Sequence, residues 1–78
     1  MPHSAQGLGI DLELDANDHL TALGAVLGGT TLHHKTLDPT TLDTFGAPAD
    51  FVFGHNILHH DLPWLARHHP RLALLQKP

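Results

Sequence analysis

Three carboxylates stand in settings that would bring them together on one sheet. Asp11 and Glu13 lie two residues apart in a segment of alternating hydrophobicity, and Asp61 follows a short apolar run at the expected start of a helix. Residues two apart on a strand share a face and lie about 6.6 Å apart along it. Carboxylate oxygens are the ligands that hard divalent cations prefer. The expected chemistry is therefore the binding of divalent metal ions by Asp11, Glu13 and Asp61.

Each of these residues also has a purely structural explanation. An Asp-x-Glu pair is typical of the solvated face of an amphipathic strand, and Asp is a common helix N-cap. Asn56 is typical of a turn, whereas Trp64 and Leu65 are expected in the core. The metal-site hypothesis therefore depends on all three acidic groups meeting within reach of shared cations.

The nine histidines are many for 78 residues, and six of them form the adjacent pairs 33–34, 59–60 and 68–69. Neighbouring side chains on a strand or helix point to different sides, so such a pair rarely binds one ion. His55 and His59 are four apart, but the segment between them lacks the Glu of a zinc-protease helix. We expect these imidazoles to be exposed or partly packed, and a histidine-based metal site remains an alternative.

The secondary structure expected around the acidic groups follows from the apolar pattern. Strict alternation over 8–14 predicts a half-buried strand. Strands are also expected over 20–27 and 30–37, joined by a Gly28-Gly29 hairpin turn, although the apolar residues of 20–27 would also suit one face of a helix. Asp38 and Pro39 predict the start of a helix that Gly46 closes. The run 51–53 predicts a central strand buried on both faces. A second helix with Asp61 as its N-cap and Pro63 in its first turn is expected to end before Pro70, and another apolar element follows at 72–75.

Topology rules then limit how these elements assemble. The order is β-β-β-α-β-α, so a meander would make the third strand parallel to the first. The helix over 38–46 can cross over, right-handed, and lay the fourth strand parallel beside the first. The segment ending at Asn56 would then lie next to the strand that carries Asp11 and Glu13. The expected fold class is α/β: a three-stranded antiparallel meander plus a parallel strand with helices.

Composition limits the class of protein. The length allows one small domain, and no run approaches the roughly 20 apolar residues of a membrane-spanning helix. There is no cysteine, and residues 1–7 lack the pattern of a signal peptide, so a cytoplasmic protein without membrane contact is expected. The net charge of −4 argues against a stand-alone nucleic-acid binder. It does not exclude a nuclease, because metal ligands are part of the acidic count.

Two motifs together resemble a known family. The piece Asp11-Leu12-Glu13 and the piece Gly54-His55-Asn56-Ile57-Leu58-His59-His60-Asp61-Leu62-Pro63-Trp64-Leu65 resemble the DEDD-type 3′–5′ exonucleases, the DnaQ-like group on an RNase H-like fold. With Pro70 to Leu75 following, the chain more closely resembles the exonuclease-like domain attached to some RecQ-family helicases. The resemblance covers Gly9 to Pro78 and implies an incomplete RNase H-like fold.

The resemblance also implies roles for particular residues. Asp11 would bridge two Mg²⁺ or Mn²⁺ ions, Glu13 would hold the ion that binds the attacking water, and Asp61 would help to hold the second. Asn56 and Leu12 would contact the substrate. The implied partner is single-stranded DNA, or more generally the 3′ end of a nucleic acid, with a helicase or a missing C-terminal part of the parent chain as possible associates.

Two departures from the family pattern limit the expected activity. His60 stands where the family usually has Phe or Tyr, and the fourth Asp with its preceding Tyr or His has no counterpart in these 78 residues. The helix between the third and fourth strands is also short. We therefore expect residues 1–78 to be a single truncated exonuclease-like domain that is inactive, or nearly so, alone. The alternatives are a non-catalytic interaction module and a His-rich metal-binding protein.

Overall fold

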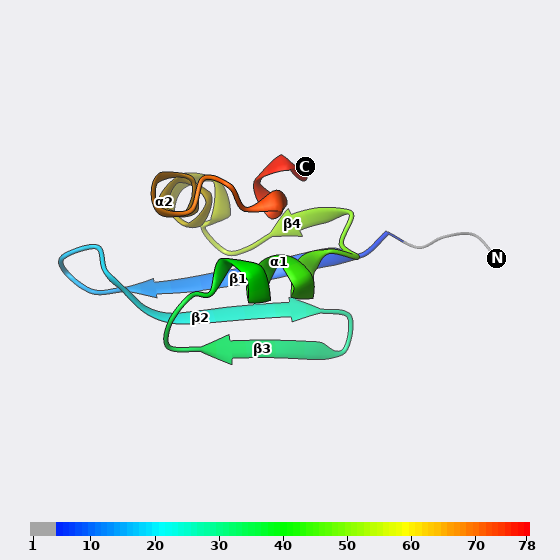
Figure 1. The fold of residues 1–78 in the computed structure, drawn as a ribbon, viewed down its shortest axis with the longest axis horizontal. Coiled ribbons are helices and arrows are strands. Elements are labelled where there is room, and N and C mark those ends of the chain that lie inside the picture. Colours follow the sequence, from blue (N-terminus) through cyan, green and yellow to red (C-terminus); the bar gives the residue numbers. More distant parts are fainter. Residues whose placement is uncertain (1–4) are drawn as a thin grey trace.

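The computed structural model describes residues 5–78, which form a four-stranded mixed sheet with helices (Figure 1). The strands are β1 (Gly7–Leu14), β2 (Leu20–Leu27), β3 (Thr30–His34) and β4 (Phe51–Phe53), in the spatial order β3-β2-β1-β4. β2 is antiparallel to both β1 and β3, whereas β4 is parallel to β1. The expected α/β class, the meander and the parallel fourth strand are confirmed.

Helical elements follow the meander. They are α1 (Pro39–Gly46), a π-helical turn η1 (Ile57–Asp61), α2 (Leu62–His68) and a short 3₁₀ helix η2 (Ala73–Gln76). The predicted start of α1 is confirmed, because the Asp38 side chain accepts a hydrogen bond from the Thr40 N–H and Pro39 opens the helix. Within residues 5–78, no helix has the length and apolar character needed to cross a membrane.

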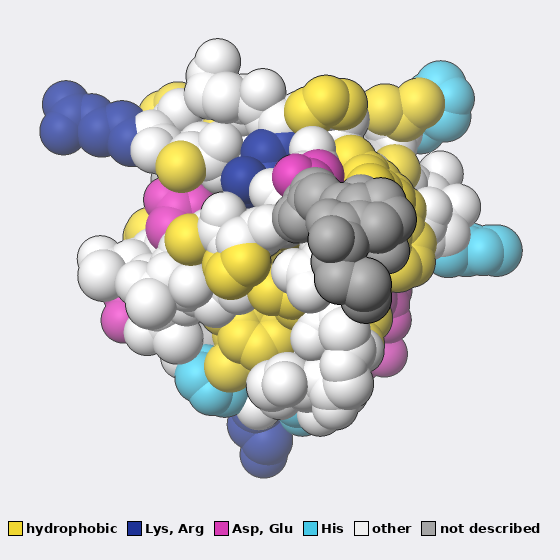
Figure 2. Space-filling view, turned by 90° about the vertical axis from the view of Figure 1, so that its right-hand side faces the viewer, with side chains coloured by type: hydrophobic (Ala, Val, Ile, Leu, Met, Phe, Trp, Pro, Cys, Tyr) yellow, Lys and Arg dark blue, Asp and Glu magenta, His cyan; other side chains and the backbone are white. Residues whose placement is uncertain are grey.

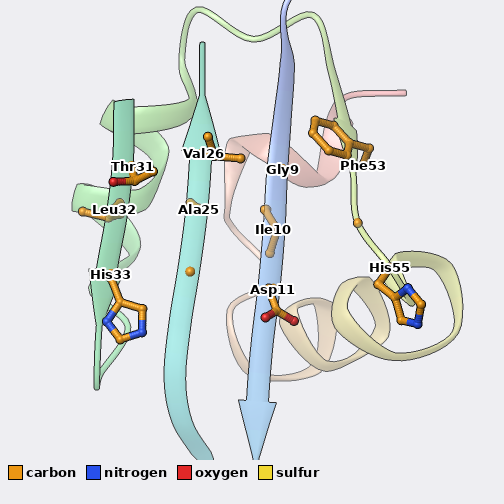
Figure 3. A pocket seen from close by; sticks show the side chains of 12 residues that line it. Gly9, Ile10, Asp11, Ala25, Val26, Thr31, Leu32, His33, Phe53 and His55 are labelled. Carbon is orange, nitrogen blue, oxygen red and sulfur yellow. The ribbon is translucent and has the colours of Figure 1, made fainter. Parts of the chain in front are cut away.

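The core lies between one face of the sheet and these helices. Leu8, Ile10 and Leu12 of β1 point into it, alternating with residues on the opposite face. The other buried apolar residues come from β2, α1, α2 and the two segments that follow the helices: Leu23, Ala25, Leu42, Ala49, Trp64, Leu65, Leu72 and Leu74. The predicted core positions of Trp64 and Leu65 are confirmed. Both α1 and α2 lie behind the sheet in Figure 3. Asp11, Glu13 and Thr31 are exposed on the opposite face, which we call the bare face.

Long-range hydrogen bonds join the β1–β2 turn to α2, and the edge strand β4 to Pro78. The indole Nε1 of Trp64 donates to the Asp18 carbonyl at 2.9 Å, and Arg67 pairs with the Asp18 carboxylate at 3.0 Å. Asp18 has a left-handed backbone with φ of 67°, as a tight turn between β1 and β2 requires. At the far edge of the sheet, the Val52 N–H donates to the Pro78 carbonyl at 3.0 Å. The β1–β2 turn and the outer edge of β4 are therefore both tied down.

Two strand predictions were wrong in detail. β4 is an edge strand rather than a central one, and Phe51 and Phe53 are 37% and 48% exposed on the bare face. A run of three apolar residues has no period that distinguishes burial on one face from burial on two. β3 ends at His34 rather than at Leu37, because the chain turns there toward α1.

Both helix ends lie where predicted, since α1 ends at Gly46 and α2 begins directly after Asp61, but the capping expected at each end was wrong. Asp61 makes no side-chain capping bond and has helical dihedrals, because η1 already coils the chain ahead of α2. Gly46 is the last residue of α1 and lacks the positive φ of a C-terminal glycine cap. Its role is packing: a Cβ there would lie 2.7 Å from Cδ2 of Leu8, which is fully buried.

Candidate functional site

The bare face of the sheet carries the side chains that could do chemistry. The strand registers set two rows across it. The first row pairs Phe53 with Gly9, Gly9 with Val26, and Val26 with Thr31; the second pairs Asp11 with Gly24, and Gly24 with His33. Directly paired residues share a face. The bare face therefore changes from apolar to polar along the direction of β1.

Asp11 and Glu13 lie together on this face, as predicted. Both are exposed, and they alternate with the buried Ile10 and Leu12. Within residues 5–78, neither carboxylate takes part in an ion pair. Two unpaired carboxylates on adjacent same-face positions are available to a cation from solvent.

Asp61 lies in a different environment. It is the last residue of η1 and is only 3% exposed. Its Oδ1 lies 2.8 Å from Nδ1 of His60, whose own side chain is 42% exposed. A buried carboxylate needs a partner that offsets its lost hydration, and the imidazole supplies one. His60 thus binds the neighbouring acid directly.

The wide turn before Asp61 is built on the backbone of Asn56. Its carbonyl accepts from the His60 N–H at 3.0 Å and from the Asp61 N–H at 3.4 Å. Just before it, Gly54 passes so close to β1 that a Cβ would lie 2.5 Å from the Ile10 carbonyl oxygen. Only glycine fits that crossing, so the chain after β4 is held against the strand that carries Asp11.

The predicted site residues are therefore only partly gathered. Asp11 and Glu13 share a face, but residues 5–78 contain no group of three or more His, Asp or Glu side chains arranged to hold one metal ion. Asn56 is exposed beside η1. Leu12 is 5% exposed on the core side, so its side chain does not reach the face where the two carboxylates lie. The histidines visible in Figure 2 project at separate places on that face, where hydrophobic side chains also reach the surface.

A shallow groove of about 390 Å³ runs over the bare face and includes Asp11. Figure 3 shows Asp11 between His33 and His55 at one end of the groove, with Phe53 and Val26 near its apolar end. Sequence reasoning missed Phe53, Gly24 and His33 as groove residues. The available signal was the shared register of the three strands, which sets Gly24 between Asp11 and His33.

Comparison of this chain with protein-family models, with curated proteins and with solved structures finds no match. The chemistry of the site is therefore inferred from its own residues and their arrangement.

Proposed function

We propose that this chain is the front part of a metal-dependent 3′–5′ exonuclease domain with an incomplete RNase H-like fold. The observation that carries the proposal is the parallel pairing of β1 with β4, in which Gly9 faces Phe53. It makes the Asp11–Glu13 strand a neighbour of the segment that leads through Asn56 to Asp61. Such adjacency is what an Asp-x-Glu strand and a following Asn…Asp segment need in order to share cations.

The chemical character of the carboxylates supports this function. Asp11 and Glu13 offer exposed oxygen ligands that no cationic side chain neutralises within residues 5–78. A Mg²⁺ or Mn²⁺ pair, when bound, would activate water and stabilise the leaving 3′ oxygen. The third ligand is not preassembled, so Asp61 has to leave His60 for the site to close. A π-helical turn such as η1 is a frequent feature of functional sites and supplies a place for that adjustment.

Paramagnetic broadening by Mn²⁺ tests the proposed metal site. In NMR spectra of the labelled chain, substoichiometric Mn²⁺ is expected to broaden Asp11, Glu13 and Asp61 first. Asp38 and Asp43, on the α1 side, serve as internal carboxylate controls and should stay sharp at that dose. The Asp11→Asn chain should lose the broadening at Glu13. Broadening confined to histidine signals would instead favour the histidine-based metal binder and contradict the proposal.

Hydrolysis by the 78 residues alone is expected to be weak. A single-stranded oligonucleotide with Mn²⁺ should remain largely intact, because no residue of the chain corresponds to the fourth carboxylate or the general base of the family. Robust digestion that Asp11→Ala abolishes would show that those groups are dispensable. Digestion that survives Asp11→Ala would point to a contaminating nuclease and would leave this chain without demonstrated activity.

A non-catalytic interaction module is the second candidate function. Phe51 and Phe53 are exposed on the bare face, and within residues 5–78 the outer edge of β3 pairs with no other strand. Exposed strand edges pair readily with another chain. Concentration-dependent self-association in sedimentation velocity runs, together with no Mn²⁺ effect at Asp11, would favour this function over the nuclease.

A further inference from the structure

A second groove, of about 420 Å³, lies between the start of α1 and the turn that follows α2. Pro39, Thr40 and Asp43 of α1 form one wall, and residues 69–72 form the other. We call it the α1–turn groove. It shares no residue with the groove on the bare face. A ligand bound here would therefore leave the carboxylates of β1 free.

Hydrogen bonds hold both walls of the α1–turn groove in place. In the turn, the Leu72 N–H donates to the His69 carbonyl at 3.2 Å, and Pro70 at the second position fixes the backbone. Across the groove, the Asp43 carboxylate accepts the Ala73 N–H at 2.8 Å and the next N–H along the chain at 3.3 Å. These bonds join α1 to the segment after the turn. The groove is thus formed before a ligand arrives, as small binding sites usually are.

The α1–turn groove has an apolar base and a cationic rim. Leu72 is only 2% exposed at the base, and Pro39 and Pro70 are exposed on the two walls. Arg71 is exposed at the tip of the turn. Both oxygens of Asp43 already accept backbone N–H groups, so this carboxylate does not occupy the arginine.

Arg71 is one of four Lys and Arg residues in the chain. Arg67 pairs with the Asp18 carboxylate, and Nζ of Lys77 donates to the Ala49 carbonyl at 2.7 Å. Within residues 5–78, the Arg71 side chain makes neither an ion pair nor a hydrogen bond. Its planar guanidinium has two parallel N–H donors that match the two oxygens of a carboxylate. The rim of the groove therefore complements an anionic ligand of that shape.

We propose that the α1–turn groove binds an acidic peptide segment of a partner protein. A carboxylate of the peptide pairs with Arg71, and a neighbouring apolar side chain packs on Leu72 and the two prolines. The lining contains no Phe, Tyr or Trp on which a nucleobase would stack. A groove with a single arginine and no lysine also lacks the basic cluster that anionic membranes attract. The inference goes beyond the proposed nuclease, because this binding needs no metal ion.

Peptide binding by the full chain in the presence of EDTA tests the inference. The probe is the acetylated and amidated peptide Leu-Glu-Leu-Glu, followed by NMR, and Leu-Gln-Leu-Gln is its uncharged counterpart. We expect shifts at Thr40, Arg71 and Leu72 with the acidic peptide and much weaker binding of the uncharged one. Arg71→Gln should lower the affinity about five-fold, the upper range for one exposed ion pair. Lys35→Gln is the matched control, because it removes the same charge from an exposed residue outside the groove and should leave the affinity unchanged.

A second variant tests the groove apart from the charge. Thr40→Phe places a bulky side chain on the exposed wall of the groove and should weaken binding, while thermal unfolding checks that the fold is kept. The inference is overturned by unchanged affinity in both Arg71→Gln and Thr40→Phe, or by an equal loss in Lys35→Gln. Equal binding of the two peptides, or shifts confined to other surfaces, also overturns it. Inorganic phosphate that reproduces the shift at Arg71, while the peptide leaves Leu72 unshifted, would show a simple anion site and contradict peptide recognition.

Discussion

The contact between Gly46 and Leu8 gives a sharp test of how α1 packs on the sheet. Gly46→Ala would add a Cβ 2.7 Å from Cδ2 of Leu8, whereas carbon atoms normally pack at about 3.5–4.0 Å. Leu8 is fully buried, so its side chain cannot swing into solvent to relieve the overlap. Overpacking of this kind costs about 1–3 kcal/mol. Alanine in place of glycine returns up to about 1 kcal/mol of helix propensity, and less at the last residue of a helix.

The net expectation is a loss of about 1–2 kcal/mol in the free energy of unfolding. For a domain of this size that lowers Tm by about 4–16 °C. Urea and thermal unfolding followed by far-UV circular dichroism measure both quantities. Gly29→Ala is the matched control, because nothing lies within 4 Å of the added Cβ and its φ is not positive. A Gly46→Ala chain that is as stable as the wild type would refute this account of the α1–β1 contact.

Two further predictions concern the β1–β2 turn. Trp64→Phe removes the Nε1 hydrogen bond to the Asp18 carbonyl and should cost about 1–3 kcal/mol in urea unfolding, so unchanged stability would contradict the role given to that bond. The Asp15 carboxylate accepts the His19 N–H and the Asn17 N–H, and these bonds hold its pKa below the ordinary value of 3.8. Because that pKa is lower in the folded state, its stabilising effect is present above the unfolded pKa and is lost as pH falls through the folded one. A ¹³C NMR titration should show Asp15 ionising below 3.8, and Asp15→Asn should reduce the acid sensitivity of folding.

Much of the fold was predictable because local signals agreed with it. Alternation over β1 fixed its buried face, and the Gly28-Gly29 pair predicted the hairpin, where Gly28 has φ of 60°. The Asp38-Pro39 pair predicted the start of α1. These signals act within a few residues, and no distant contact opposes them. The parallel placement of β4 followed from the handedness of crossover connections.

The errors occur where distant contacts decide the outcome. Phe51-Val52-Phe53 is apolar throughout, yet β4 lies at the sheet edge because the chain supplies no strand beyond it within residues 5–78. Asp61 was expected to cap a helix, but the bonds to the Asn56 carbonyl extend the coil past it. The role of Gly46 was misassigned, and that of Gly54 was not explained. Gly46 packs against Leu8 and Gly54 against the Ile10 carbonyl, and both neighbours are far away in sequence.

The candidate site likewise has one part that local sequence signals predict and another that depends on distant contacts. The shared face of Asp11 and Glu13 follows from a period of two, which the sequence displays directly. The position of Asp61 depends on the width of one turn and on a bond to His60, neither of which has a sequence period. The groove depends on three strands in register, with glycine at the centre of the polar row. Such a recess is a property of the assembled sheet and of no single segment.

The indole of Trp64 contacts both α2 and the turn between β1 and β2. It is 5% exposed in the core, it stacks on the His68 imidazole at 4.3 Å, and it bonds the turn that begins where β1 ends. Glu13 lies next to that end of β1. Loss of the bond to the Asp18 carbonyl would change the polarity around the one tryptophan of the sequence. Its fluorescence emission should therefore report the separation of the turn from α2 without any added dye.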